Sequence, residues 1–261
     1  MLKTQSFTRN LYVANQYAAK PQSLENKVIL ITGAGDGIGR AVALTYAKLG
    51  ATCILLGRTV SKLENTYDAI VDAGYPEPAI VPLDLKGASA QHYKDMGNTI
   101  IDQFGHLDGL VLNASILGML CPFSQIKQDE WQDIMQVNVN ASFMLIQGVL
   151  PALEKSPGSA SVITTTSTVG REGRKFWGTY SVSKFATEGM TEVLAAEYDA
   201  QNIRFNCVNP GGTRTAMRAS AFPAEDKAQL RTPEDIMPTY CYLMSDDSIE
   251  HTGHLFECQP K

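Results

Sequence analysis

The sequence lacks the patterns of membrane, secreted and nucleic-acid-binding proteins. No apolar run approaches the roughly 18–20 residues that span a bilayer. Residues 1–7 (MLKTQSF) lack the apolar stretch of a secretory signal. A net charge of -5 argues against the basic face that nucleic-acid binders carry. No internal repeat or low-complexity segment is present. We therefore expect a cytoplasmic protein with neither membrane nor nucleic-acid partners.

Cysteine and histidine do not form the patterns of disulfide or metal sites. The cysteines are odd in number, scattered and without a C-x-x-C pair, which is typical of buried free thiols in a reducing compartment: Cys53, Cys121, Cys207, Cys241 and Cys258. His251 and His254 lie three residues apart. Apart from sequence neighbours, no acidic or cysteine side chain stands near them at ligand spacing, so we expect no metal.

The length and composition suit one large α/β domain. The chain has 261 residues, of which 44% are hydrophobic and 19% charged, as in an ordinary globular protein. Residues 1–24 are polar with scattered aromatics and are expected to form an N-terminal arm. This segment would be an arm or short helix lying across the domain or a neighbouring subunit, or else a disordered tail. Residues 25–261 are expected to form the single domain.

Apolar runs alternate with helical patterns along this domain. Strands are predicted at residues 27–32, 51–56, 79–84, 107–113, 161–165, 203–208 and 254–258. Helices are predicted at 40–49, 61–72, 89–104, 129–153 and 180–197, with short helical pieces at 225–230 and 234–245. This alternation predicts a doubly wound, mostly or fully parallel sheet of about seven strands with helices on both faces. In such sheets ligands bind beyond the C-terminal ends of the strands.

A glycine-rich loop follows the first predicted strand. Residues 32–39 read T-G-x-x-x-G-x-G between an apolar strand and a helix, the context of a dinucleotide-binding loop. The glycines let backbone N–H groups approach a pyrophosphate at the positive end of the helix. The candidate contacts here are Gly33, Gly35, Asp36, Gly37, Ile38 and Gly39. A glycine-rich turn without a ligand is the alternative.

Other polar residues fall at the ends of later strands. Arg58 follows the second strand, where an arginine favours a 2′-phosphate, so we expect NADP(H) to be preferred over NAD(H) unless Arg58 is only a surface residue. Asp84 and Leu85 close the third strand beside the expected adenine. Asn113 and Ala114 close the fourth strand beside the cofactor.

Tyr180 and Lys184 stand four residues apart at the start of a predicted helix. Side chains at this spacing lie on one helix face, about 5–6 Å apart at Cβ. A free phenol has a pKa of about 10 and is a poor acid or base at neutral pH. A neighbouring ammonium favours the phenolate and lowers that pKa. The alternative is a surface tyrosine beside a solvated lysine.

With these motifs in view, the chain resembles the short-chain dehydrogenase/reductase family from about residue 27 to 257. The glycine loop, Asn138, Ser167 and the Y-x-x-x-K pair match in order and spacing, as does Asn-Pro-Gly at 209–211. Segments 131–140 and 211–223 resemble the bacterial YciK-like oxidoreductases within this family.

The resemblance implies a role for each matching residue. Tyr180 would exchange a proton with the substrate oxygen, and Lys184 would lower the Tyr180 pKa and bind the nicotinamide ribose. Ser167 would hydrogen-bond the substrate oxygen as charge develops there. Asn138 would hold a water that connects Lys184 to solvent. Asn113 would lie against the adenosine ribose, while Pro210, Gly211 and Thr213 would border the nicotinamide. The hydride itself is cofactor chemistry.

Three departures from the family pattern stand out. Ser115 occupies a position that is usually glycine, where its side chain could narrow the junction of cofactor and substrate. Asp36 stands where NADP-preferring members often have a basic residue, which keeps NAD(H) possible. The C-terminal strand lacks the usual Asp-Gly-Gly ending, which puts its usual subunit contacts in doubt.

The loops around the expected pocket leave the substrate open. Five cations could hold a carboxylate, a phosphate or a thioester carrier, or could belong to solvated loops: Arg171, Arg174, Lys175, Arg214 and Arg218. A second set could form an apolar pocket wall or ordinary loop packing: Leu117, Met119, Leu120, Phe176, Trp177, Met217 and Phe222.

The favoured function is an NADP(H)-dependent oxidoreductase that interconverts a carbonyl and an alcohol, with Tyr180 as general acid/base. A 3-oxoacyl-thioester reductase and a non-catalytic NADP(H)-binding sensor are the alternatives. A Rossmann-type transferase lacks support because it needs no Y-x-x-x-K helix. The family resemblance further implies a homodimer or homotetramer that pairs through helices 129–153 and 180–200.

Overall fold

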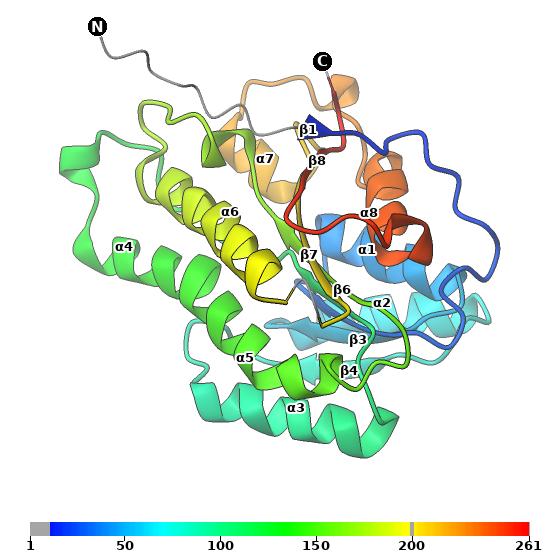
Figure 1. The fold of residues 1–261 in the computed structure, drawn as a ribbon. Helices are drawn as coiled ribbons and strands as arrows, with labels where there is room; N and C mark the ends of the chain where they lie inside the picture. Colours follow the sequence, from blue (N-terminus) through cyan, green and yellow to red (C-terminus); the bar gives the residue numbers. More distant parts are fainter. Residues whose placement is uncertain (1–10, 199–200, 261) are drawn as a thin grey trace, which may run out of the picture.

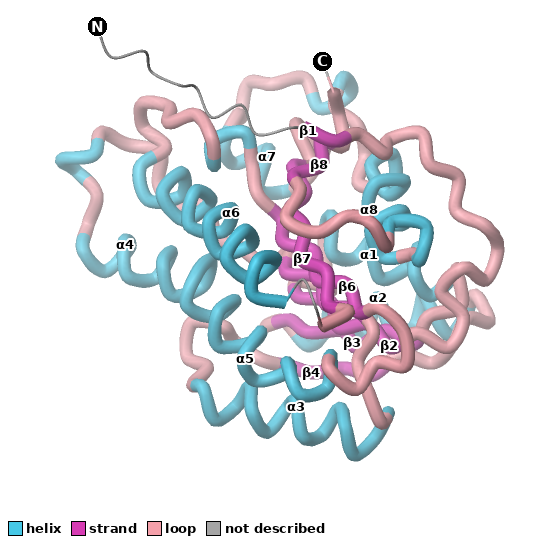
Figure 2. The backbone as a smooth tube through the Cα atoms, viewed as in Figure 1, coloured by secondary structure: helices cyan, strands magenta, loops and turns pink. Residues whose placement is uncertain are grey.

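The computed structural model describes residues 11–198 and 201–260. Residues 1–10 of the expected arm, the last two residues of the predicted helix 180–200, and residue 261 lie outside the described residues. The described part forms one eight-stranded sheet in the order β1-β8-β7-β6-β5-β2-β3-β4, with helices on both faces (Figures 1 and 2). Every neighbouring pair of strands runs parallel, so the predicted doubly wound fold is confirmed.

All seven predicted strands are present, and an eighth lies at the edge. The predicted strands are β2 (Val28–Thr32), β3 (Thr52–Gly57), β4 (Ala79–Pro82), β5 (Gly109–Leu112), β6 (Ala160–Thr165), β7 (Ile203–Asn209) and β8 (Leu255–Glu257). The residues of β2, β5, β6 and β7 are buried throughout, as continuous apolar strands covered on both faces should be.

The additional strand, β1 (Leu11–Tyr12), comes from the segment expected to be an arm. It pairs with β8 through Leu11 opposite Leu255 and Tyr12 opposite Phe256. The Tyr12 ring packs 4.1 Å from the His254 ring and 5.4 Å from the Phe256 ring, measured between centroids. Two residues are too few to show a strand period, so the sequence pattern could not reveal this strand.

Two apolar clusters fix the helices to the two faces of the sheet. One face carries α1 (Gly37–Lys48), α2 (Val60–Asp72) and α8 (Met237–Met244). The other carries α3 (Ala90–Phe104), α5 (Ala141–Leu153) and α6 (Gly178–Tyr198). Figure 1 shows α4 (Gln128–Met135) leading into α5 beside α6.

The helices differ from prediction at three places. The predicted helix 129–153 is interrupted by a π-helical turn, Gln136–Asn140, between α4 and α5. The short helix predicted at 225–230 is only a 3₁₀ turn, Lys227–Gln229. An unpredicted helix, α7 (Ala216–Ala221), precedes it because the Thr215 side chain accepts a hydrogen bond from the Arg218 N–H and caps the helix.

The strand order places a switch point between β2 and β5. From β2 the chain moves outward through β3 and β4, then returns to the other side of β2 as β5 and moves outward again. The loops that leave β2 and β5 therefore diverge to opposite faces. A crevice opens between diverging loops of this kind at the C-terminal ends of the strands.

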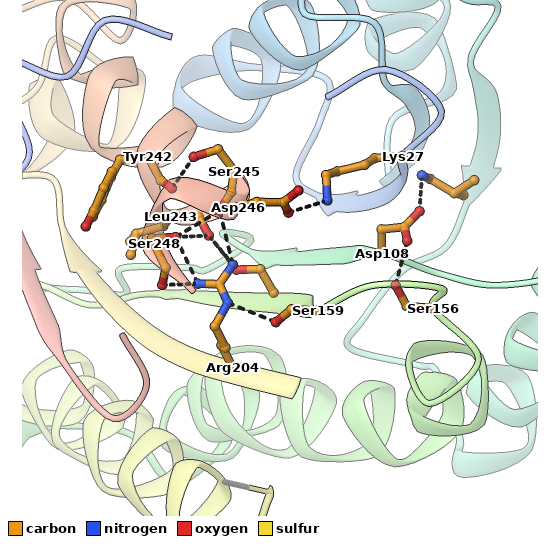
Figure 3. Close-up of polar contacts among 12 residues, drawn as sticks. Lys27, Asp108, Ser156, Ser159, Arg204, Tyr242, Leu243, Ser245, Asp246 and Ser248 are labelled. Atoms are coloured by element: carbon orange, nitrogen blue, oxygen red, sulfur yellow. Dashed lines mark hydrogen bonds and ion pairs between the residues drawn. The ribbon is translucent and has the colours of Figure 1, made fainter. Parts of the chain in front are cut away.

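At the N-terminal end of β7, away from the cleft, a buried arginine joins several segments through hydrogen bonds (Figure 3). Arg204, near the start of β7, donates from Nε to Ser159 Oγ (3.1 Å) and from Nη1 to Ser248 O (3.0 Å) and Oγ (2.9 Å). Its Nη2 donates to the carbonyl oxygens of Leu243 (3.1 Å) and Ser245 (3.3 Å). Burial lowers the pKa of Arg204 to about 10. This network ties the turn after α8 to β7, away from the ends of the strands where ligands bind.

Within the described residues, no helix combines the length and the apolar character needed to cross a membrane. All five cysteines are buried and unpaired, as the sequence predicted.

Candidate active site

A cleft of about 600 Å³ opens at the C-terminal ends of the strands. This volume is within the range of about 300–1,000 Å³ that small-molecule sites occupy. Most of the residues predicted from the sequence line it: Gly33, Gly35, Asp36, Gly37, Ile38, Arg58, Asp84, Leu85, Asn113, Ala114, Ser167, Tyr180, Lys184, Pro210, Gly211 and Thr213. Gly39 and Asn138 are the two that do not, and both lie directly behind the lining.

The glycine loop is shaped by close approaches between backbones. Gly33 has φ +70°, in the left-handed region, and its N–H donates to the Leu56 carbonyl (2.8 Å). A Cβ added at Gly39 would collide with the Gly33 carbonyl oxygen, so Gly39 brings α1 against the loop. The first residues of α1, Gly37 and Ile38, consequently line the cleft, where the positive end of the helix dipole favours an anion.

Asp36 forms both a helix cap and an ion pair at the mouth of this loop. Its carboxylate accepts from the Gly37 N–H (2.7 Å) and pairs with Lys62 Nζ at 2.5 Å. The hydrogen bond from Lys62 is the main reason that the Asp36 pKa is lowered. Lys62 and Arg58 both line the cleft. The α2 helix thus places a basic side chain, Lys62, directly beside Asp36.

The Thr32 hydroxyl joins the ends of β2 and β5. It donates to the Val111 carbonyl (3.2 Å) and accepts from the backbone N–H groups of Asn113 and Ala114, both at 3.0 Å. These bonds set Asn113 and Ala114 in the cleft wall. Asp84 accepts from the Lys86 N–H (3.0 Å), which shapes the turn after β4.

Asn138 lies in the π-helical turn and is 4% exposed. Its Oδ1 accepts from the Ile116 N–H (2.9 Å), while its Nδ2 donates to the Ile116 carbonyl (3.0 Å) and to Ser183 Oγ (3.0 Å). The side chain therefore holds the loop after β5 against α6. This is a positioning contact; the water-holding role implied by the resemblance stays a prediction.

The Tyr180 phenol lies beside two serine side chains on the cleft wall. It is 8% exposed and hydrogen-bonds to Ser167, the predicted partner, and to Ser115. Burial raises the pKa of Tyr180 to about 12, and the two serine hydrogen bonds only partly oppose this rise. Burial therefore outweighs the two hydrogen bonds, and the lowering of this pKa by Lys184 stays a prediction.

Lys184 is 3% exposed and shares its helix face with Tyr180. Its Nζ lies 5.5 Å from the centre of the Tyr180 ring and donates to the Thr165 carbonyl at 2.8 Å. Burial lowers the pKa of Lys184 to about 8. The two side chains thus line one site, and burial disfavours the charged form of each.

The loop after β7 closes the far end of the cleft. Pro210, Gly211 and Thr213 line it, and Gly211 has φ +70°. Gln259 Nε2 donates to the carbonyls of Pro210 (2.8 Å) and Gly212 (3.2 Å) and holds this loop in place. Gln259 was missed because its position so near the C-terminus carries no motif.

The cations proposed for an anionic substrate mostly have other partners. Arg171 pairs with Glu257 and lies 3.6 Å from Glu188, and Arg214 donates to three backbone carbonyls of residues 227–230. Arg218 alone among the five lines the cleft, and it makes two hydrogen bonds to Glu225 (2.7 and 2.6 Å). Lys175 lies over the Phe176 ring, 5.7 Å from its centroid.

Three of the seven apolar loop residues face the cleft: Leu117, Trp177 and Met217. The cleft lining does not include Met119, Leu120, Phe176 or Phe222.

The cleft lining contains no histidine among the described residues. The rings of His251 and His254 pack against each other, with centroids 5.2 Å apart, and against Tyr12 of β1. Over the described ranges, no group of three or more His, Cys, Asp or Glu side chains is arranged to hold a metal ion.

Sequence reasoning missed Lys62 and the bond from Ser115 to Tyr180. Lys62 carried a usable signal, since it lies four residues after Arg58 at the start of a predicted helix. Ser115 was considered only for its size, because its distance from Tyr180 in the sequence hides their contact.

Comparison with known proteins supports this picture. The family model for short chain dehydrogenases matches residues 27–226. The chain is 51% identical over 244 residues to the uncharacterized oxidoreductase YciK of Escherichia coli (strain K12), covering 94% of this chain and 96% of that relative. It is 31% identical over 240 residues to the 3-oxoacyl-[acyl-carrier-protein] reductase FabG of Thermotoga maritima, covering 89% and 96%.

A solved structure of a short chain dehydrogenase from Shigella flexneri 2a, complexed with NADP, resembles the fold with a TM-score of 0.90. That protein is 51% identical, and the match covers 92% of this chain and 100% of the other. The likeness to YciK confirms the subgroup suggested by segments 131–140 and 211–223. Because the family model matches most of the sequence and the relatives match nearly all of it, the chain belongs to the short-chain dehydrogenase/reductase family.

Proposed function

We propose that this protein is an NADP(H)-dependent oxidoreductase that interconverts a carbonyl and an alcohol. The observation that carries the proposal is the meeting of Tyr180, Ser167 and Lys184 on one wall of a cleft whose other end is a glycine loop. Family membership makes oxidoreductase chemistry with a nicotinamide cofactor the expected activity.

The cleft fits a dinucleotide with a 2′-phosphate. The N-terminus of α1 faces the site for the pyrophosphate, and Arg58 and Lys62 provide two positive charges past the end of β3. The Shigella flexneri relative is described in complex with NADP, which supports the same cofactor here. Asp36 pairs with Lys62 and offsets part of this positive charge, which reduces the preference for a 2′-phosphate and keeps binding of NAD(H) possible.

Cofactor preference is tested by titrating the protein with NADPH and NADH. Arg58→Ala and Lys62→Ala should each weaken NADPH binding by about tenfold and NADH binding much less, because each removes a charge-assisted contact to phosphate. Lys94→Ala, on the exposed side of α3, is the matched control. Equal effects on both cofactors would contradict the assignment of this end of the cleft.

The residues around the substrate oxygen suit proton donation. When bound, a reduced nicotinamide supplies the hydride to the carbonyl carbon. As the carbonyl π electrons move onto oxygen, Tyr180 gives its phenolic proton to that oxygen and Ser167 donates a hydrogen bond to it. The raised pKa of Tyr180 keeps this proton in place at neutral pH. Lys184 then stabilises the phenolate that remains.

A panel of aldehydes and ketones tests the activity, with NADPH oxidation followed by absorbance. Tyr180→Phe keeps the ring but removes the transferable proton, and should lower kcat by about 10²–10⁴-fold, the usual contribution of general acid catalysis. A wild-type protein that binds NADPH but oxidises it with no carbonyl would instead support the non-catalytic sensor.

A 3-oxoacyl-thioester reductase remains the narrower alternative. The Thermotoga maritima relative bears that name at 31% identity. Of the five cations that suggested it, Arg171, Arg214 and Arg218 have partners within the protein, and the cleft lining does not include Arg174 or Lys175. The structure therefore supports a general carbonyl reductase better than a 3-oxoacyl-thioester reductase.

We further propose a homodimer or homotetramer in the cytoplasm. Large apolar side chains stand exposed on the predicted pairing helices: Phe143 on α5 and Val182, Phe185 and Val193 on α6. Apolar groups gathered on one face commonly mark an interface. Unpaired buried cysteines suit a reducing compartment. Light scattering at micromolar concentration should give a dimer or larger, and a monomer would contradict the assembly.

A further inference from the structure

The cleft wall beyond Tyr180 is aromatic and apolar. The Trp177 ring lies 5.9 Å from the Tyr180 ring and 5.7 Å from the Phe222 ring, between centroids. Leu117, Met217 and Ala221 line the cleft with Trp177. Trp177 thus lines the cleft between Tyr180 and Phe222, which directly follows α7. A flat apolar surface at this position favours a ring as its partner.

The positive charge on this side of the cleft is neutralised within the protein. Among the described residues that line the cleft, the cations are Arg58, Lys62, Lys86, Lys184 and Arg218. The first three follow β3 and β4, at the end assigned to the cofactor, and Lys184 is bonded to the Thr165 carbonyl. Arg218 is therefore the cation beside Trp177 that an anionic substrate would have to use.

Arg218 is poorly placed for that purpose. Its Nε and Nη2 both donate to the Glu225 carboxylate, and its guanidinium lies 3.9 Å from the centroid of the Phe222 ring. The Arg218 bond is the main reason that the Glu225 pKa is lowered. A substrate carboxylate or phosphate would meet an arginine already paired in the geometry that carboxylates prefer, with a second negative charge beside it.

We propose, building on the carbonyl reductase function, that the substrate is an uncharged ketone or aldehyde with an apolar ring next to its carbonyl group. The ring would lie against Trp177, with the carbonyl oxygen directed to Tyr180 and Ser167. The Arg218–Glu225 pair would act against substrates that carry a carboxylate. Trp177 would then select substrates that carry a ring. Glu225 would select against substrates that carry a negative charge.

Three probe compounds separate the two parts of the proposal. Acetophenone and acetone differ by the ring, and acetophenone and 4-acetylbenzoate differ by a carboxylate on the same ring. With NADPH saturating, kcat/KM should be highest for acetophenone and at least about tenfold lower for each of the others, the discrimination that pocket contacts of this size provide. Equal or better use of 4-acetylbenzoate or acetone by the wild type would overturn the proposal.

Variants assign the preference to the named residues. Trp177→Ala should reduce the ratio of kcat/KM for acetophenone over acetone by about tenfold, and Trp177→Phe should retain most of it, since a ring remains. Trp131→Phe alters the other tryptophan, which packs on Phe123 outside the cleft lining, and should leave the ratio unchanged. An unchanged ratio in both Trp177 variants would contradict the role of this ring.

Glu225→Gln tests the role of charge. It keeps the size of the side chain but frees the Arg218 charge, so kcat/KM for 4-acetylbenzoate should rise about five- to tenfold relative to acetophenone. No relative gain would contradict the role of the pair.

Calorimetric titration of the same compounds into NADPH-saturated Tyr180→Phe separates this proposal from the proposed function. Acetophenone binding more tightly than 4-acetylbenzoate, with no carbonyl turned over by the wild type, would sink the function but leave the ligand class standing. The reverse order of affinity would overturn the ligand class whatever the turnover.

Discussion

Tyr180 and Lys184 are both buried, and burial shifts the pKa values of both side chains. The sequence placed them one helical turn apart, and the structure keeps that spacing, with Lys184 Nζ 5.5 Å from the Tyr180 ring centre. Desolvation nevertheless raises the pKa of the phenol to about 12 and lowers that of the amine to about 8. Sequence spacing predicts which side chains lie close together, but not how much water remains around them.

The Ser115 hydroxyl should lower the pKa of Tyr180. Its hydrogen bond lowers the Tyr180 pKa, so Ser115→Ala should raise that pKa by about one unit, the size of a hydrogen bond to a charged group. Alcohol oxidation needs the phenolate. The rise of kcat/KM with pH for the oxidation of 1-phenylethanol by NADP⁺ should therefore shift to higher pH.

Ser115→Thr keeps the hydroxyl and is the matched control for this shift. A pH profile that stays in place in Ser115→Ala would show that this hydroxyl does not act on Tyr180.

Lys184 should cost the folded protein stability at neutral pH. Its folded pKa, about 8, lies below its ordinary value of 10.5, so the unfolded chain binds the proton more tightly. The penalty is complete below pH 8 and fades as the pH rises from 8 toward 10.5. Lys184→Met should thus be more stable than wild type at pH 7, by about 3 kcal/mol less the roughly 1 kcal/mol of the lost hydrogen bond to Thr165.

Urea unfolding of both proteins at pH 7 and pH 10 measures this difference. The advantage of Lys184→Met should shrink at the higher pH, because the wild-type lysine is then mostly neutral in the folded state. An advantage that grows with pH would contradict the assigned burial.

At the scale of elements, the C-terminal ends of the strands form the candidate site. At the N-terminal end of β7, a buried arginine stabilises the fold. Arg204 satisfies its guanidinium with carbonyls and hydroxyls around the turn after α8 (Figure 3). The sequence showed only an arginine in an apolar strand, at a position where a β-strand pattern would favour an apolar residue. Its partners come from residues 39–45 positions away, so no local pattern could reveal them.

Arg204→Met should lower the free energy of unfolding by about 2–4 kcal/mol, because several buried carbonyls and hydroxyls lose their donor at once. Arg204→Lys should be no better, since one ammonium cannot replace the planar fork. Urea unfolding measures the loss. Lys27→Met removes the exposed ion pair to Asp246 in the same region and should cost less than about 1 kcal/mol. Similar losses in Lys27→Met and Arg204→Met would contradict the anchoring role.

Elements with strong periodicity were predictable, and those fixed by single contacts were not. Strands β2–β8 and helices α1, α2, α3, α5 and α6 follow from apolar runs and turn residues. The edge strand β1 depends on pairing with β8, and α7 depends on the Thr215 cap. The π-helical turn at Asn138 depends on contacts with Ile116 and Ser183 on other elements.

At the scale of the whole molecule, strand order creates the site. Because β5 returns to the other side of β2, the loops after these strands part, and the cleft forms where they do. This is why strand ends alone identified most of the cleft lining. Pairs formed across elements, such as Asp36 with Lys62 and Arg218 with Glu225, required the fold. In our proposals these pairs bear on cofactor preference and substrate charge, which the sequence left partly open.

The central claim is that Tyr180 delivers a proton to a carbonyl oxygen beside a nicotinamide held in this cleft. The most direct test is a single-turnover experiment that mixes NADPH-saturated protein with acetophenone and follows NADPH absorbance, for wild type and Tyr180→Phe at equal NADPH occupancy. We predict that the wild type oxidises its bound NADPH at least 100-fold faster than Tyr180→Phe, as loss of a general acid requires. Equal rates in the two proteins, or no oxidation in either with any carbonyl compound, would contradict the account.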